Sequence, residues 1–155
     1  MRRFAATAAF ALALFLFAAV PAMAAPGHTI TSTEHQHGSW VEYGDTNPVT
    51  GDTIDVHFDG NSVQHMTYFP AGDEVWATFT ETGSIWFVDN GVTYSGHATV
   101  WGNFNLNQRN SNQTFTLTVH AIGTDGTSVW VHETSHITYN GNGVITVAFD
   151  KLRLD

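Results

Sequence analysis

The chain has 155 residues, 43% of them hydrophobic, with 14 Asp and Glu against 5 Lys and Arg and a formal net charge of −9 when its nine His are neutral. It has no Cys, which excludes disulfides, thiol catalysis, Cys-ligated zinc and iron–sulfur clusters. The acidic balance repels phosphate, so we expect no nucleic-acid partner and no binding to an anionic membrane surface.

The first 24 residues have the parts of a secretory signal peptide in the right order. Arg2-Arg3 gives a positive start, an uncharged apolar run covers 5–20, and the small residues of 22–24 form a cleavage site. The apolar run is shorter than the roughly 20 residues of a membrane span, although a retained anchor is the alternative. We therefore expect membrane contact only during export, a secreted or cell-envelope exterior location, and one domain at 25–155.

The mature segment alternates apolar and polar residues between Gly-, Asn- and Asp-rich turns, without helical periodicity. This pattern predicts eight strands, at about 28–43, 53–59, 62–69, 74–88, 92–107, 113–122, 127–139 and 144–153. Asp59-Gly60 is read as a hairpin turn because Gly tolerates positive φ. Short links favour antiparallel neighbours. The predicted fold is all-β: a single eight-stranded, mainly antiparallel up-and-down barrel.

The alternation assigns one face of each strand to the barrel interior. This face is mostly apolar, and its Gly and Ala positions relieve crowding in a narrow barrel. The predicted interior positions are Val75, Ala77, Phe79, Glu81, Gly83, Ile85 and Phe87, then Val92, Tyr94, Gly96, Ala98, Val100, Gly102, Phe104 and Leu106, then Phe115, Leu117, Val119 and Ala121, and finally Ile145, Val147 and Phe149.

The opposite face carries Trp and His set among Thr residues. Thr is ordinary on the surface of a strand, whereas four Trp on the solvent side are not. Trp offers a flat apolar area with a hydrogen-bonding edge, so we expect a recognition surface, with a homo-oligomer contact or cover by loops as alternatives. Beside Trp76, the predicted ligand-binding residues are Trp86, His97, Trp101, His120, Trp130, His132 and His136.

Two His pairs have spacings that suggest a metal. On a strand, however, His132 and His136 lie about 13 Å apart, too far to share one ion. His35-Gln36-His37 with Glu42 resembles the first metal motif of the cupin family, but no His follows Pro70-Ala71-Gly72, where the second motif would place one. Exposed polar residues on an N-terminal strand are the preferred interpretation of His35 and His37.

The loop after the first strand has the acidic spacing of a loose calcium site. Val49 occupies a ligand position there and no terminal Glu follows, so a solvated turn is expected instead. The residues in question are Asp45, Asn47, Asp52 and Asp55. No phosphate loop, nucleophile elbow or dinucleotide fingerprint occurs in the sequence. We predict no catalytic residue, no metal and no cofactor.

Glu133 falls on the interior side of its strand, where a carboxyl could act as a general acid or base. A hairpin closing at 140–142 would place Lys151 beside it on the same face. A cross-strand ion pair near the barrel mouth then accounts for both residues without catalysis, and this interpretation is preferred.

Several segments resemble an uncharacterised family of small secreted actinobacterial all-β proteins. They are Tyr94-Ser95-Gly96, Trp101-Gly102, Gly123 to Thr127, His132 to His136 and Val147 to Lys151. The resemblance covers most of the mature chain and brings no activity. Proteins of the family that it resembles carry one Cys just after the Asn-Pro and another near the C-terminus. This chain has Val49 and Leu154 at those places. More distantly, the strand plan is similar to calycin and allene oxide cyclase/dirigent-like barrels.

These features predict a non-catalytic binding or interaction module that uses the outer Trp and His face. Its partner would be a small molecule, a glycan or a protein. One alternative is a small barrel enzyme of the cyclase/dirigent type acting on an apolar ligand in its lumen, and another is a homo-oligomeric structural protein. Because the histidines of this face protonate as pH falls from about 7.5 to 5.5, docking there should depend on pH.

Overall fold

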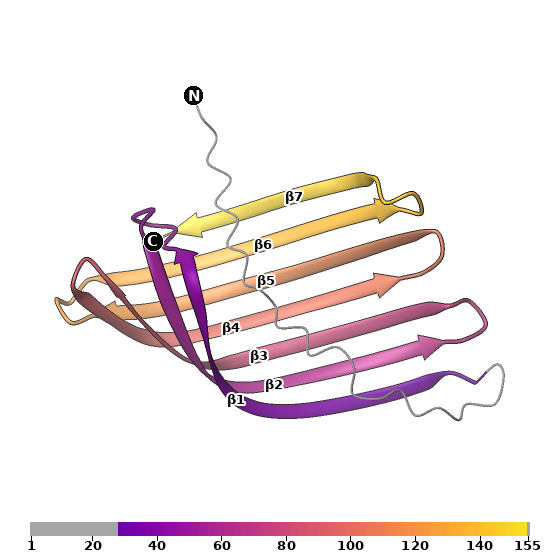
Figure 1. Cartoon of the computed structure of the whole chain (residues 1–155), viewed down its shortest axis with the longest axis horizontal. Coiled ribbons are helices and arrows are strands. Elements are labelled where there is room, and N and C mark those ends of the chain that lie inside the picture. The colour runs from indigo at the N-terminus through magenta and orange to yellow at the C-terminus, as the bar shows by residue number, and fades with distance from the viewer. Residues whose placement is uncertain (1–27, 155) are drawn as a thin grey trace.

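The computed structural model describes residues 28–154, and the expected signal peptide lies outside this range. The described chain is all-β, and its strands are β1 (Ile30–Thr46), β2 (Thr53–Phe69), β3 (Glu74–Asp89), β4 (Val92–Leu106), β5 (Asn110–Gly123), β6 (Ser128–Asn140) and β7 (Ile145–Leu154). They form a single antiparallel sheet in which each strand pairs with the next along the chain (Figure 1). Residues 28–154 contain no helix long and apolar enough to cross a membrane.

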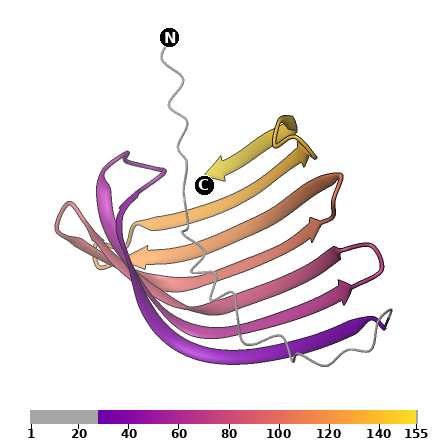
Figure 2. The same ribbon diagram turned by 45° about the vertical axis from the view of Figure 1, so that its right-hand side comes forward.

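The sheet is curved and open. Within residues 28–154 the edge strands β1 and β7 pair with β2 and β6 and not with each other. Figure 2 shows the strands forming a trough, with one end of the β1–β2 hairpin curling over it. The all-β, up-and-down, antiparallel prediction is therefore confirmed, whereas the described chain has seven strands in an open sheet and not the eight of the predicted barrel.

The missing strand is explained by Gly60, which does not form a turn. The chain runs straight through it as part of β2, so the predicted hairpin at Asp59-Gly60 is wrong. In the register, Gly60 lies between Gly38 of β1 and Gly83 of β3. A Cβ atom on Gly60 would lie 2.4 Å from the backbone oxygen of Thr82. Glycine is needed here for close approach of strands, and we attribute the bend of the hairpin to this row.

The core lies on the inner face of the sheet, under the curled end of the hairpin. The register places the predicted interior positions of β3, β4 and β5 on this face, so their assignment to one face is confirmed, whereas Leu106 at the end of β4 is exposed and not interior. The buried apolar side chains are Ile54, Val56, Phe58, Ile85, Phe87, Ala98, Val100, Leu117, Val119, Ala121, Val129 and Val131, with Trp40, Phe79 and Tyr94 packed against them. Trp40 stacks on Phe58 with ring centroids 4.3 Å apart.

The β1–β2 loop is fastened to the turn between β3 and β4. Asn47 is only 1% exposed, and its Nδ2 donates to Oδ2 of Asp89 over 2.7 Å. Thr50 Oγ1 donates to the same oxygen over 3.0 Å, and Asn90 Nδ2 donates to Asp52 over 2.8 Å. The prediction of a solvated turn is therefore wrong at Asn47. This side chain is buried and hydrogen-bonded to the buried carboxylate of Asp89.

The other edge, β7, is exposed along its whole length. Its register with β6 shifts by one residue just after Ile145. Such a bulge moves every later side chain to the opposite face. Val147 and Phe149 consequently face outward and not into the interior as predicted, and Phe149 stacks on the outer-face His136 with centroids 5.4 Å apart.

The same shift alters the charges along β7. Lys151 pairs with Thr134 and Arg153 with His132, so both cations lie on the outer side. Asp150 pairs with Ser135, on the side of Glu133. The predicted Glu133–Lys151 ion pair is therefore wrong, because the two side chains lie on opposite faces of the sheet.

Candidate functional site

All seven residues predicted to bind ligand lie on the outer face, where backbone register decides which of them meet. His97 of β4 pairs directly with His120 of β5, and His120 pairs directly with Trp130 of β6. Trp130 also stacks on His132 with ring centroids 5.9 Å apart and planes 14° apart. These four residues form one continuous group over three neighbouring strands, which we call the His–Trp cluster.

Trp86 of β3 lies next to this cluster and has a partner that the sequence did not indicate. It stacks on His57 of β2, with centroids 3.5 Å apart and planes 9° apart. One face of the indole is thus covered by an imidazole, while the side chain remains 45% exposed. The alternation could have identified His57, since it lies on the outward side of β2 and within the strand predicted at 53–59, but its pairing with Trp86 depends on strand register.

Trp101 and His136 are not part of the cluster. Trp101 follows His97 by four residues on β4, which places it about 13 Å further along the strand. His136 follows His132 by four residues on β6, again about 13 Å away. Trp101 is 44% exposed among Thr80 and Thr116. The predicted residues therefore form a cluster and two separate positions on one long face.

Thr residues hydrogen-bond two of the predicted outer histidines, His132 and His136. His132 Nδ1 lies 3.1 Å from Thr118 Oγ1, across the β5–β6 pair. His136 bonds Thr114 through Nδ1 at 2.6 Å and Thr138 through Nε2 at 3.0 Å. A hydroxyl can donate or accept, so these bonds persist with either imidazole tautomer. The rings are oriented along the sheet surface by their Thr neighbours.

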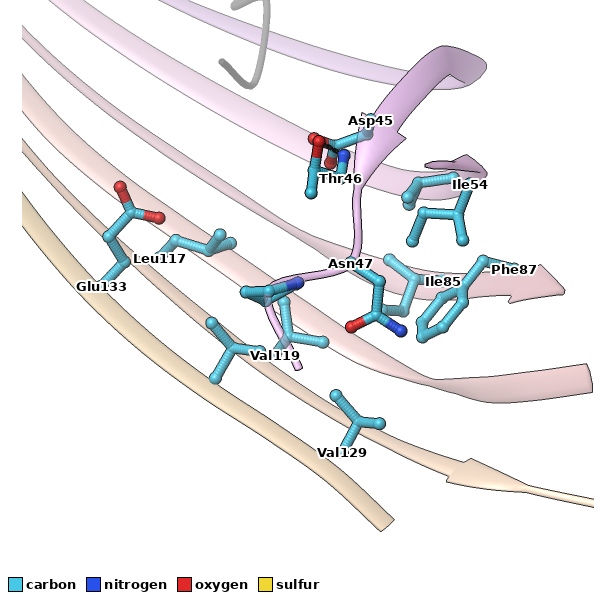
Figure 3. Close-up of a pocket in the computed structure, with 13 residues that line it drawn as sticks. Asp45, Thr46, Asn47, Ile54, Ile85, Phe87, Leu117, Val119, Val129 and Glu133 are labelled. Atoms are coloured by element: carbon cyan, nitrogen blue, oxygen red, sulfur yellow. Dashed lines mark hydrogen bonds between the residues drawn. The ribbon is translucent and has the colours of Figure 1, made fainter. Parts of the chain in front are cut away.

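The inner face contains a pocket where the end of β1 crosses the sheet (Figure 3). It has a volume of about 50 Å³. Most of its wall is apolar, from Pro48, Ile54, Val56, Ile85, Phe87, Leu117, Val119, Val129 and Val131. The polar part of the wall comes from Asp45, Thr46, Asn47 and Glu133.

Glu133 is the electrostatically unusual residue of this pocket. It is 4% exposed, and burial raises its pKa to about 7, helped by the charge and hydrogen bond of Asp150 and by the charge of Asp45. Burial also raises the pKa of Asp45. Glu133 of β6 and Asp45 of β1 thus line the pocket, and Asp150 of β7 hydrogen-bonds Glu133. Asp150 was missed because the bulge in β7 gives no sequence signal.

The described residues offer no cluster of side chains that could bind a metal ion. Within residues 28–154 no three His, Asp or Glu side chains come together in a way that could hold an ion. His35 and His37 are exposed on β1, and His37 Nδ1 donates to the backbone oxygen of Gly60 over 2.7 Å. His132 and His136 are each engaged with Thr hydroxyls instead.

Comparison with known proteins leaves the site to be judged from its chemistry. No family model matches the chain, and neither the curated proteins nor the solved structures include a significantly similar one.

Proposed function

We propose that the protein is a secreted, non-catalytic binding module whose ligand docks on the outer face of the sheet, over the His–Trp cluster and Trp86. The observation that carries this proposal is the flat stack of Trp86 on His57, in which the Trp side chain stays 45% exposed. A ring held in this way presents apolar area without losing further side-chain freedom on binding.

The surroundings of the indoles favour a ligand with both apolar faces and hydroxyl groups. His97, His120 and Thr99 lie beside the Trp side chains and offer hydrogen-bond donors and acceptors. The acidic chain disfavours polyanions. A neutral glycan combines a flat C–H face with many hydroxyls and is the partner class that this chemistry suits best.

The proposal is tested by titrating the protein with neutral oligosaccharides of the cellulose, chitin and xylan types while recording Trp fluorescence. Trp86→Ala and Trp130→Ala should each weaken binding at least about tenfold, which corresponds to about 1.4 kcal/mol of lost contact. Trp101→Ala should affect hexasaccharides and spare disaccharides, because Trp101 lies about 13 Å beyond the cluster.

Tyr94→Phe serves as the matched control. Tyr94 is an aromatic residue of the same strand as His97, but it packs on the inner face against Phe87. It should bind like the parent protein. Equal loss in Tyr94→Phe and Trp86→Ala, or no saccharide response in any form, would argue against an outer glycan site.

Two other functions stay open as proposals. A cyclase- or dirigent-like enzyme would hold its ligand on the inner face, and the pocket beside Glu133 is the feature that favours it. A homo-oligomeric structural protein would pair the edges of β1 and β7 between two copies, because these edges are open within residues 28–154. The same two edges would pair within one chain if the sheet closed into a barrel. Light scattering in solution separates the monomeric barrel from the oligomer.

A further inference from the structure

The inner pocket has the walls of a ligand cavity and a size that suits a small apolar chain. A single water needs about 10–15 Å³ of such space, so the 50 Å³ of this pocket has room for a few atoms of a ligand. Water is stable in a cavity only with two to four polar partners. The side formed by Val119, Val129 and Phe87 offers none.

The other side of the pocket is acidic, and no Lys or Arg of residues 28–154 lines it. Glu133 lines it from β6 and Asp45 from β1, while Asp150 of β7 hydrogen-bonds Glu133. In Figure 3, Glu133 lies at one side of the pocket and Asp45 lies on the part of β1 that crosses over the sheet. Lys151 and Arg153 lie on the outer face.

The geometry points to a second binding site in this pocket, for a small alkylammonium ligand with its apolar chain against Val119 and its ammonium group between Glu133 and Asp45. A cation beside a carboxylate is attracted more strongly in a partly buried site than in water, because the effective dielectric constant is lower there. The pKa of Glu133 is raised mainly by burial and further by the negative charges of Asp150 and Asp45, and a bound ammonium group would offset those charges.

The same arrangement sets the pH dependence of binding. The ionisable groups that face Glu133 are Asp45 from β1 and Asp150 from β7, while β2, β3 and β5 contribute Ile54, Ile85 and Leu117. Asp89 of β3 lies farther along the pocket and is bonded by Asn47 and Thr50. Because an ammonium ion favours ionised Glu133, it should bind more tightly at pH 8 than at pH 5.5.

The test uses three probes of equal chain length: n-butylammonium, n-butanol and butyrate. Each is titrated into the isotope-labelled protein, and backbone amide shifts are followed by NMR. Butylammonium should shift the amides of pocket residues such as Val119 and Val131, and should bind about tenfold more tightly than butyrate at pH 8. Glu133→Gln should remove the preference for butylammonium over butyrate while butanol still binds.

Glu81→Gln is the matched control. Glu81 lies on the same inner face, and its pKa is also raised by burial, but it does not line the pocket. Its variant should keep the preference for butylammonium. Should Glu133→Gln fail to fold, the three probes on the parent protein at pH 5.5 and 8 still decide the matter.

Three results would overturn the site: equal binding of butylammonium and butyrate, shifts that map to the outer face, or equal loss of preference in the Glu81 and Glu133 variants. The oligosaccharide titration reports on the outer face separately. Failure of one site therefore does not affect the test of the other.

Discussion

The two faces of the sheet are made by alternate residues of the same strands, yet they are stabilised in different ways. On the inner face, Phe58, Ile85 and Val119 exclude water, and the end of the hairpin covers them. On the outer face, Thr and His side chains form hydrogen bonds with one another that are at most half-buried, as Thr118 does with His132. Inner side chains should thus determine stability, while outer ones can change with little cost and are available for recognition.

The sharpest test of this comparison concerns the glycine row beneath the bend. A Cβ on Gly83 would lie 2.3 Å from the backbone oxygen of Asp59, whereas a Cβ on Gly38, in the same row, would meet nothing within 4 Å. We expect Gly83→Ala to lower the free energy of unfolding by about 3 kcal/mol and Gly38→Ala to change it by less than about 0.5 kcal/mol.

Urea denaturation of both variants measures the difference. Equal losses at the two positions would mean that close backbone approach at Gly83 is not what the bend requires.

The second test concerns pH and the buried carboxyl. Because the pKa of Glu133 is raised from 4.5 to about 7, the folded protein binds a proton there that the unfolded chain releases. Its contribution to stability is complete below about pH 4.5 and is lost as pH rises through 7. Relative to Glu133→Gln, the parent should lose about 3 kcal/mol of unfolding free energy between pH 4 and pH 8.

Chemical denaturation at several pH values follows this difference, and Glu81→Gln, outside the pocket, is the comparison variant. Parallel stability profiles for the parent and Glu133→Gln would contradict the assignment.

The smallest effect comes from exchanging Val and Thr at neighbouring positions. Val119 is 8% exposed on the inner face, and Thr118 lies on the outer face beside it. Val119→Thr buries a hydroxyl among apolar groups and should cost about 1–2 kcal/mol. Thr118→Val gives up one half-buried hydrogen bond to His132 without burying a polar group among apolar ones, and should cost about 0.5 kcal/mol. Thermal unfolding of the two variants would contradict the comparison if the order were reversed.

Local alternation was enough to predict the faces of β3, β4 and β5, because each of these strands runs from turn to turn without interruption. It failed at Gly60 and after Ile145, for two different reasons. Gly60 has the residue type of a turn, but the approach of Gly83 from another strand determines its role. The bulge in β7 adds one residue to one strand and leaves no compositional trace.

The candidate site was predicted in part. The alternation of residues along each strand placed the seven Trp and His residues on one face. Only strand register could show that His97, His120 and Trp130 are adjacent while His136 is remote. The burial of Asn47 depends on Asp89, 42 residues away, and the environment of Glu133 depends on Asp45 and Asp150. Such long-range partners are set by the bend of the sheet, which alternation does not encode.

The attachment of the β1–β2 loop to Asp89 has a consequence for the order of folding. Every strand pairing in this sheet joins neighbours along the chain, so the meander can grow by short loop closures. Docking of the hairpin end spans 42 residues between Asn47 and Asp89 and should follow the pairing of β2 with β3 and of β3 with β4. The same segment should be the first to detach in the native state, so amide hydrogen exchange should be faster in 45–52 than in β4 or β5. Access to the pocket would then need only this local opening, while the rest of the sheet stays folded.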